Sequence, residues 1–301
     1  MQSAHSAVFR QNNFWRGVIT ICGLFMIFIT LAIGAFLCYK GVGTFTTYGH
    51  SIGEFLFSSQ WAPADNAQGG GKVGAAIFIF GSIITCALAL LISTPFSIAS
   101  AIFMTEISPG IGRKILQPAV EIFVGIPSVV YGWIGLTILV PFIKDLFDLK
   151  FGFSVLAAGI VLAVMIYPTI TSLSADAIRS IPKSFRQASY GLGATRWQTI
   201  SQVVIPASKS GLMTAIVLGL ARAFGEALAV AMVIGKMKAF PESLLSPTTN
   251  LTAAIASDMG GAMEGSEYNI ALWSMALLLF IISLCFIFII HYISNKGGHK
   301  A

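Results

Sequence analysis

The chain has 301 residues, of which 56% are hydrophobic and only 10% carry a charged side chain. Ordinary globular domains carry about 25% charged residues, so this composition excludes a soluble globular protein and indicates an integral membrane protein. A net charge of +6 would suggest nucleic-acid binding in a soluble chain. In a membrane protein it is explained by lysine and arginine on the cytoplasmic side, so no nucleic-acid partner is expected.

The apolar segments predict an all-α, polytopic membrane protein with six transmembrane helices. A helix needs about 20 apolar residues to cross the hydrocarbon core of a bilayer. The predicted spans are Val18–Leu37, Gly74–Met104, Ile115–Ile143, Phe153–Ser174, Ser210–Gly235 and Asn269–Ile293. The first is expected to remain as an uncleaved anchor, because its apolar run is long for a signal peptide and no small-residue cleavage site follows it.

The cysteines give no sign of a metal site. They lie in or beside the apolar segments without metal-ligand spacing, at positions Cys22, Cys38, Cys86 and Cys285. They are therefore expected to be buried as small apolar side chains. No metal and no cofactor is expected.

The distribution of lysine and arginine predicts the orientation of the chain. With the N-terminus inside, the inner segments hold eleven basic residues: Arg10, Arg16, Arg113, Lys114, Arg179, Lys183, Arg186, Arg196, Lys209, Lys296 and Lys300. The outer segments hold six: Lys40, Lys72, Lys144, Lys150, Lys236 and Lys238. Both termini and the loop between the fourth and fifth spans are therefore expected in the cytoplasm.

That loop, Arg179–Lys209, has internal order of its own. Ser184–Gln187 and Thr195–Gln198 each fit the capping box that begins a helix, and glycines at 191 and 193 separate them. The second helix is expected to end at Pro206 and to place three apolar side chains on one face: Trp197, Ile200 and Val204. Two short helices around a glycine hinge suit docking into a groove of a partner. The alternative is a pair of amphipathic helices that rest on the lipid surface.

Several segments resemble a known family. Gln187-Ala188-Ser189, Gly193 and Val203–Pro206 resemble the cytoplasmic EAA loop of ABC importer permeases, Glu-Ala-Ala, three residues, Gly, nine residues and Ile-x-Leu-Pro. Residues 121–132 and 219–226 are similar to the PstC family of phosphate-importer permeases, and the resemblance covers roughly residues 70–293. Gln187 stands where the family usually has Glu, and Ser189 replaces its second Ala.

The resemblance implies a MetI-like permease subunit of a phosphate ABC importer in the cytoplasmic (inner) membrane. Residues 1–70 would be the N-terminal tail, first span and extracytoplasmic insert, 71–295 the permease domain with the coupling loop 179–209, and 296–301 the C-terminal tail. The implied partners are a second homologous permease (PstA-like), an ATPase dimer (PstB-like), an extracytoplasmic phosphate-binding protein (PstS-like) and the lipid bilayer. The chain itself would not be an enzyme. The residues implied in coupling to the ATPase are Gln187, Ala188, Ser189, Gly193 and Pro206.

Three ionisable residues fall inside the predicted spans: Glu121, Arg222 and Glu226. Each costs about 2.5–3.5 kcal/mol at mid-helix on insertion scales, so each should face the bundle interior or a wet cavity. Arg222 and Glu226 are four residues apart and are therefore expected on one helix face. They lie beside a stripe of small residues that allows close helix packing: Gly211, Ala215, Gly219, Ala223, Ala227, Ala231 and Gly235. A helix break at Gly125–Ser128 is expected to place Pro127 and Ser128 beside the transport pathway.

Two interpretations of Arg222 remain open from the sequence. In the first, it forms a buried ion pair with Glu226 or Glu121 that fixes the packing. In the second, its guanidinium offers paired donors to a crossing oxyanion, and an ionised Glu226 accepts the proton that phosphate has and sulfate lacks. The open alternatives for the function are the sister phosphate permease, a molybdate or sulfate permease, and an anion channel or ion-coupled secondary transporter.

Overall fold

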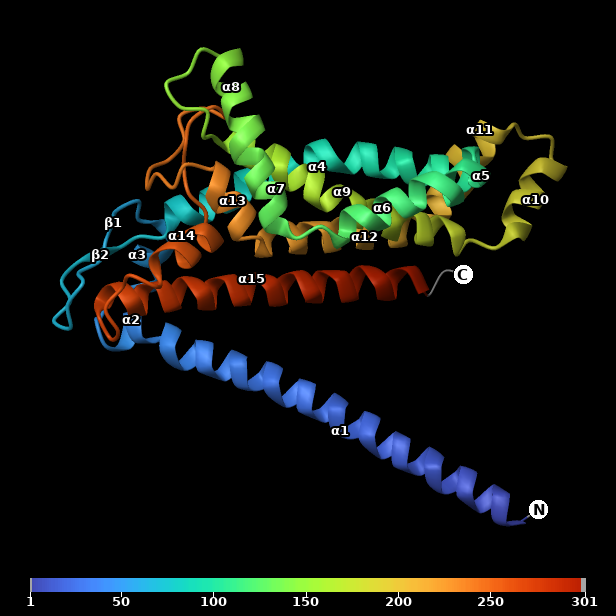
Figure 1. Cartoon of the computed structure of the whole chain (residues 1–301), viewed down its shortest axis with the longest axis horizontal. Helices are drawn as coiled ribbons and strands as arrows, with labels where there is room; N and C mark the ends of the chain where they lie inside the picture. The colour runs from blue at the N-terminus through green and yellow to red at the C-terminus, as the bar shows by residue number, and fades with distance from the viewer. Residues whose placement is uncertain (1, 299–301) are drawn as a thin grey trace.

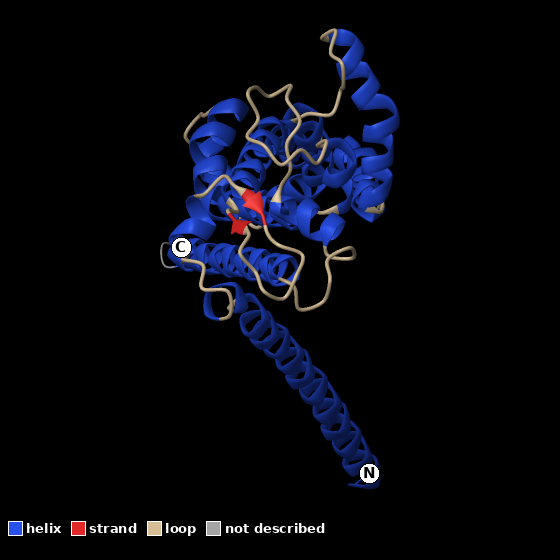
Figure 2. Ribbon diagram, turned by 90° about the vertical axis from the view of Figure 1, so that its left-hand side faces the viewer, coloured by secondary structure: helices blue, strands red, loops and turns tan. Residues whose placement is uncertain are grey.

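The computed structural model describes the backbone of residues 2–298 and the side chains of residues 15–293. The helices are α1 (Gln2–Gly41), α2 (Gly43–Thr46), α3 (Ile52–Phe57), α4 (Ala76–Ile102), α5 (Pro109–Ile111), α6 (Gln117–Gly125), α7 (Ser128–Ile134), α8 (Val140–Leu146), α9 (Val155–Arg179), α10 (Lys183–Gly191), α11 (Arg196–Thr199), α12 (Ile205–Gly225), α13 (Leu228–Val233), α14 (Leu251–Asp258) and α15 (Glu267–Gly298). Strands β1 (Trp61–Ala62) and β2 (Lys72–Val73) pair antiparallel, with Trp61 opposite Val73. They lie among the loops at one end of the helical body (Figure 2).

Six helical segments of the described chain are long and apolar enough to span a membrane, which confirms the predicted fold class. They are Trp15–Thr46, Ala76–Ile107, Ser128–Leu146, Val155–Arg179, Arg196–Gly225 and Glu267–Ile293. The third begins at Ser128 because the chain is extended just before it, and the fifth ends at Gly225 because the chain is extended again there.

Helix α9 forms the centre of the bundle, and α4 and α12 pack against it (Figure 1). The small-residue stripe of α12 is used in this contact. A Cβ added to Gly219 would lie 2.5 Å from the Ile170 side chain, and one added to Gly211 would lie 2.5 Å from the Cβ of Ala177. Glycine at both positions therefore lets α12 approach α9 closely. The predicted stripe is confirmed as a helix–helix contact only in its first part, Gly211 to Ala223, because α12 ends at Gly225 and the positions from Ala227 onward lie beyond it.

Helix α1 leaves the body at an angle and contacts α15 only near its C-terminal end (Figure 1). Most of its described side chains are therefore exposed. The prediction of four buried cysteines was wrong for three of them. Cys86 on α4 is buried, whereas Cys22, Cys38 and Cys285 lie on outward faces of α1 and α15 that this chain does not cover.

In the described chain, each π-helical segment is followed two residues later by a proline. The segments are η1 (Phe103–Ile107), η2 (Gly112–Leu116), η3 (Gly135–Leu139) and η4 (Ile200–Val204), and the prolines are Pro109, Pro118, Pro141 and Pro206. Proline has no N–H to donate, and its ring clashes with the carbonyl four residues earlier; a wider turn relieves both problems. The prediction that Pro206 ends its helix was therefore wrong, because the helix runs on from Arg196 to Gly225.

The loop after α13 folds back into the body. Thr248, Thr249 and Asn250 are buried, and Asn250 begins α14 by accepting the N–H of Ala253 at 2.8 Å. The backbone of this loop lies directly on Gly81 of α4, where an added Cβ would meet the carbonyl oxygen of Thr249 at 1.9 Å.

Replacing Gly81 by alanine should therefore lower the thermal midpoint of the detergent-solubilised protein. The new methyl must displace backbone, and overpacking of this kind costs about 1–3 kcal/mol. Gly23→Ala in α1 is the matched control, because no atom lies within 4 Å of its added Cβ. An equal effect of the two substitutions would contradict the close contact.

Opposite the coupling loop, a buried carboxylate ties the N-terminal insert to the start of α15. Glu267 is 0% exposed and accepts the N–H groups of Ala64 at 2.6 Å and Gly71 at 2.9 Å. Its other oxygen lies 2.7 Å from Nε2 of His50, whose Nδ1 is 3.3 Å from Glu54. Burial lowers the pKa of His50, but the hydrogen bonds to Glu267 and Glu54 outweigh it and the pKa is raised.

This network should stabilise the protein more in acid than in alkali. Because the pKa of His50 in the folded state lies above its unfolded value of about 6.5, its contribution is complete below that pH and is lost as the pH rises through the folded value. His50→Gln should thus lower the thermal midpoint most at about pH 6 and least at about pH 9. The exposed His291 is the matched control: His291→Gln should show no such trend.

Candidate transport pathway and coupling site

Two membrane helices are broken in the same way. Helix α6 ends at Gly125, and Ile126 is extended (φ −71°, ψ 127°) before Pro127 begins α7. Helix α12 ends at Gly225, and Glu226 is extended (φ −77°, ψ 124°) before α13. The first break confirms the prediction at residues 125–128. Irregular backbone at membrane depth is tolerated only against protein or water, so both breaks are expected to face a protein partner or an aqueous cavity and not lipid.

The half-helices that follow the breaks pack against each other. A Cβ added to Gly132 of α7 would lie 2.7 Å from the Cα of Ala229 of α13, so the two backbones are in close contact. The hydroxyl of Tyr131 donates to the carbonyl of Phe123 at 2.8 Å and so bridges the break between α6 and α7. A Cβ added to Gly135 would likewise meet Val233, so α7 and α13 run side by side in the same direction and the breaks that precede them lie on the same side of the bundle.

Arg222 lies one turn before the second break and is half-buried. Its Nη1 donates to the hydroxyl of Thr169 on α9 at 2.6 Å. Among the side chains of residues 15–293, no carboxylate forms an ion pair with it, so the structure does not bear out the first of the two open interpretations, a pair with Glu226 or Glu121. A guanidinium has five N–H donors in a planar fork, and most of these remain available here.

The sequence predicted that Glu226 shares a helix face with Arg222. This was wrong, because α12 ends at Gly225, between the two residues. The Oε1 of Glu226 accepts the N–H of Ala229 at 3.0 Å, which satisfies one of the free amides at the start of α13. Its backbone carbonyl accepts the hydroxyl of Thr252 at 2.6 Å. Glu226 therefore holds the break in place while one of its carboxylate oxygens remains without a partner in the described structure.

Glu121 lies apart from this group. It is exposed on α6 and accepts Nε2 of Gln117 at 3.0 Å. Gln117 in turn accepts Nη2 of Arg179 at 3.1 Å. The side chain therefore belongs to a polar chain that leads to the end of α9 and the coupling loop.

The coupling loop folds as two short helices, α10 and α11, with Gly193 between them. The capping box predicted at Thr195 is confirmed: its side chain accepts the N–H of Gln198, whose Oε1 accepts the N–H of Thr195 at 2.8 Å. The box predicted at Ser184 is absent, because α10 begins two residues earlier, with Pro182 as its N-cap and no side-chain cap. Gly193 has a φ of +80°, a conformation that favours glycine.

The coupling residues predicted from the sequence lie mostly on the surface of this loop. Gln187, Ala188, Gly193 and Pro206 are exposed, and the hydroxyl of Ser189 bonds that of Thr199 at 2.9 Å, which joins α10 to α11. A groove of about 640 Å³ runs along the outer side, lined by Ser184, Phe185, Ala188, Ser189, Leu192, Ala194, Gln202 and Val203. The predicted apolar face is only partly confirmed: Ile200 and Val204 are buried, whereas Trp197 is 64% exposed.

The sequence analysis missed the contact that holds the loop to the membrane helices. Glu106, at the end of the second span, pairs with Arg186 of α10: its Oε1 lies 2.5 Å from Nη2 and its Oε2 lies 3.2 Å from Nε. Arg186 also donates to the carbonyl of Ile178 in the last turn of α9, at 3.0 Å, and to that of Ile181 just after it, at 2.8 Å. Arg196 of α11 donates to the carbonyl of Glu106. We call Glu106, Arg186 and Arg196 the loop clamp. One signal was available, since Glu106 is the only acid in the turn 105–114.

Replacing Gly193 by valine should loosen the loop and reduce its coupling to a bound partner. A left-handed conformation costs an L-residue about 1–2 kcal/mol, and a β-branched side chain is among the least tolerant. The matched control is Gly191→Val, where φ is ordinary and nothing lies within 4 Å of an added Cβ. Amide hydrogen exchange over residues 184–199 is the measurement, and equal protection in the two variants would contradict the expectation.

The family follows from comparison with known proteins. Residues 93–296 match the family described as binding-protein-dependent transport system inner membrane component. The chain belongs to this family of ABC transporter permeases. Among its relatives, the probable ABC transporter permease protein YqgH of Bacillus subtilis is 53% identical over 281 residues, 93% of this chain and 90% of the relative. The phosphate transport system permease protein PstC of Haemophilus influenzae is 34% identical over 86% of each chain.

Solved transporters share the fold of this permease. A chain of the inward-facing MetNI methionine ABC transporter superposes with a TM-score of 0.55 at 20% identity, covering 73% of the permease and 96% of that chain. A chain of a bacterial alginate ABC transporter gives a TM-score of 0.56 at 17% identity, covering 90% of the permease and 93% of that chain. These likenesses establish a MetI-like membrane architecture.

Proposed function

We propose that this permease carries inorganic phosphate across the cytoplasmic membrane as one subunit of an ABC importer. The observation that carries the proposal is Arg222, a half-buried guanidinium inside a span that is held by Thr169 and by no carboxylate of the described chain. A planar fork of free donors suits a tetrahedral oxyanion. The PstC names of several relatives give the same substrate.

The two helix breaks supply the rest of the proposed pathway. Glu226 offers one free carboxylate oxygen, which can accept a hydrogen bond from protonated phosphate and repels an anion that has no proton to donate. Pro127 and Ser128 supply irregular backbone on the side where α7 meets α13. Arg222 thus attracts the anion, and Glu226 selects its protonation state and limits how tightly it is held.

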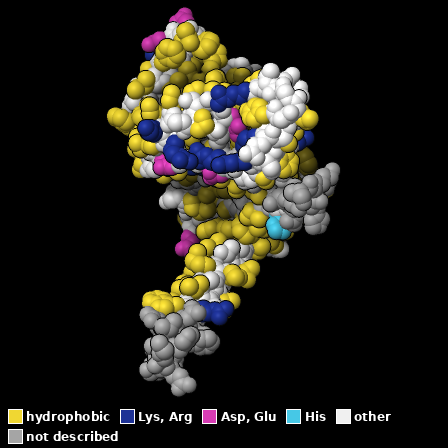
Figure 3. All heavy atoms as spheres, turned by 90° about the vertical axis from the view of Figure 1, so that its right-hand side faces the viewer, with side chains coloured by type: hydrophobic (Ala, Val, Ile, Leu, Met, Phe, Trp, Pro, Cys, Tyr) yellow, Lys and Arg dark blue, Asp and Glu magenta, His cyan; other side chains and the backbone are white. Residues whose placement is uncertain are grey.

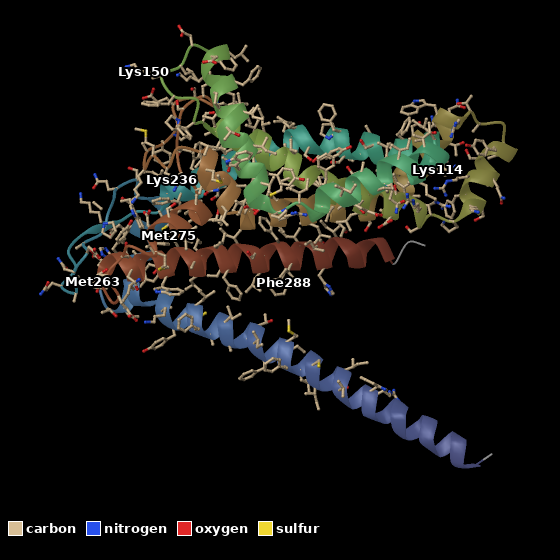
Figure 4. All side chains as sticks on the ribbon, in the orientation of Figure 1. Lys114, Lys150, Lys236, Met263, Met275 and Phe288 are labelled. Carbon is tan, nitrogen blue, oxygen red and sulfur yellow. The ribbon has the colours of Figure 1, made fainter. Side chains whose placement is uncertain are left out.

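The proposed importer needs partners that this chain does not supply. ATP hydrolysis takes place in a separate ATPase pair. This pair contacts the exposed groove of the coupling loop and the coupling residues Gln187, Ala188, Ser189, Gly193 and Pro206. A second homologous permease completes the pore, and an extracytoplasmic binding protein delivers phosphate. The permease domain is residues 71–295, and both termini lie in the cytoplasm. In support of this topology, Lys114 lies at the coupling end and Lys150 and Lys236 at the opposite end (Figure 4).

The experiment is uptake of labelled phosphate in a strain without its own phosphate importers, supplied with this permease and its neighbouring subunits. We expect uptake that needs ATP and that sulfate and molybdate leave unchanged. Uptake that persists without any ATPase subunit would instead indicate a channel or an ion-coupled transporter.

A permease for sulfate or molybdate is the second candidate. Arg222 alone would serve any tetrahedral oxyanion, and the Bacillus subtilis relative at 53% identity is named without a substrate. Glu226→Gln separates the two candidates: it should admit sulfate in a phosphate importer, because it removes the charge that repels a fully ionised anion.

A further inference from the structure

A pocket with a charged lining lies at the coupling end of the molecule, and Arg222 is not among its lining residues. Its volume is about 520 Å³, and it is lined by η1, α5, η2, the end of α9 and α10. The charged lining residues are Glu106, Arg113, Arg179, Lys183 and Arg186. Lysine and arginine side chains gather over this end of the molecule (Figure 3).

The positive charge of this pocket is not neutralised by the protein. Glu106 is its only acidic lining residue, and the bidentate contact with Arg186 already uses both of its oxygens. Arg179 lies 3.5 Å from the exposed Asp176, a weak surface contact. Among the side chains of residues 15–293, Arg113 and Lys183 have no hydrogen-bond or ion-pair partner in the chain.

We propose that this pocket binds a phosphate group on the cytoplasmic side of the membrane. Arg113 and Arg179 offer planar forks and Lys183 a point charge, the combination that recognises phosphate oxygens. The three cations come from η2, the end of α9 and the start of α10, so an anion among them cancels their mutual repulsion and joins the three elements. The bound group thereby fixes α10 to the membrane helices. Free phosphate and an anionic lipid headgroup share this chemistry.

The test uses the full-length permease in lipid nanodiscs, with Arg222→Gln present throughout so that the proposed pathway does not contribute. The probe is labelled inorganic phosphate in phosphatidylcholine discs, with potassium chloride at matched ionic strength as the reference. A second arm omits phosphate and compares thermal midpoints in phosphatidylcholine and phosphatidylglycerol discs. The pocket variant is Arg113→Gln with Lys183→Gln, both exposed positions. The matched control is Lys114→Gln, which removes a neighbouring exposed charge outside the pocket.

We expect phosphate binding whose Kd rises about tenfold or more in the pocket variant and stays unchanged in Lys114→Gln. If phosphate does not bind but phosphatidylglycerol raises the thermal midpoint except in the pocket variant, the site holds a lipid headgroup and the proposal stands. Two outcomes overturn it: no response to either probe, or an equal loss in Lys114→Gln. In both cases the cations only mark the cytoplasmic side of the membrane.

Discussion

Replacing Arg222 by glutamine should reduce phosphate uptake by a hundredfold or more while the protein reaches the membrane at its normal level. Hydrogen bonds to a charged group contribute about 1.5–3 kcal/mol each, so the loss of two such bonds to the anion corresponds to a factor of at least about 100. Glutamine retains one donor group for Thr169, whose hydroxyl accepts Nη1 of Arg222 at 2.6 Å. Because no carboxylate is paired with Arg222 in the described chain, its removal leaves no unpaired buried charge.

Two further variants separate transport from assembly. Thr169→Val removes the acceptor that positions Arg222 but keeps the positive charge, and should lower uptake by less than the loss of the arginine itself. Arg222→Lys keeps the charge but not the planar fork, and should retain little uptake if two-point contact with phosphate matters. Quantification of the assembled complex accompanies each assay. Normal uptake by Arg222→Gln would refute the pathway role of Arg222. If Arg222→Gln and Thr169→Val both fail to assemble, the bond between Arg222 and Thr169 serves helix packing instead.

The sequence predicted those features that depend on local pattern. Six apolar runs gave six spans, Gly125 and Pro127 gave the first helix break, and Thr195 with Gln198 gave a capping box, because each signal lies within a few neighbouring residues. A π-helical turn ends two residues before Pro206 and relieves the clash that would otherwise end the helix, so the helix continues through this proline.

The second helix break could not be read from its own residues. Gly225-Glu226-Ala227-Leu228 contains no proline, and an arginine and a glutamate four apart are typical of a continuous helix face. Tertiary contacts hold the break open: Thr252 donates to the carbonyl of Glu226, and the backbone of α7 at Gly132 packs on Ala229. The loop clamp was missed for a similar reason, since Glu106 and Arg186 are 80 residues apart in the chain.

Replacing Glu106 by glutamine should free the coupling loop from the membrane helices and lower the amount of phosphate moved per ATP hydrolysed. The Glu106 side chain is 10% exposed and that of Arg186 18%, so solvent screens their contact little. Loss of the charged partner should cost about 1.5–3 kcal/mol and raise amide hydrogen exchange across α10. Glutamine leaves the bonds from Arg186 to the carbonyls of Ile178 and Ile181 possible, so the loop should remain folded and still bind its ATPase.

A double-mutant cycle tests whether the clamp acts as one unit. Glu106→Gln, Arg186→Gln and the double variant should show a strong coupling energy in α10 exchange, because both single changes break the same contact. The matched cycle uses Asp176 and Arg179, an exposed pair 3.5 Å apart at the same end of the molecule, which should show almost none. A structural role alone would lower thermal stability and leave the transport-to-ATP ratio unchanged. A fall in that ratio at normal ATPase binding therefore assigns the clamp to force transmission from the loop into α4 and α9, and an unchanged ratio rules this out.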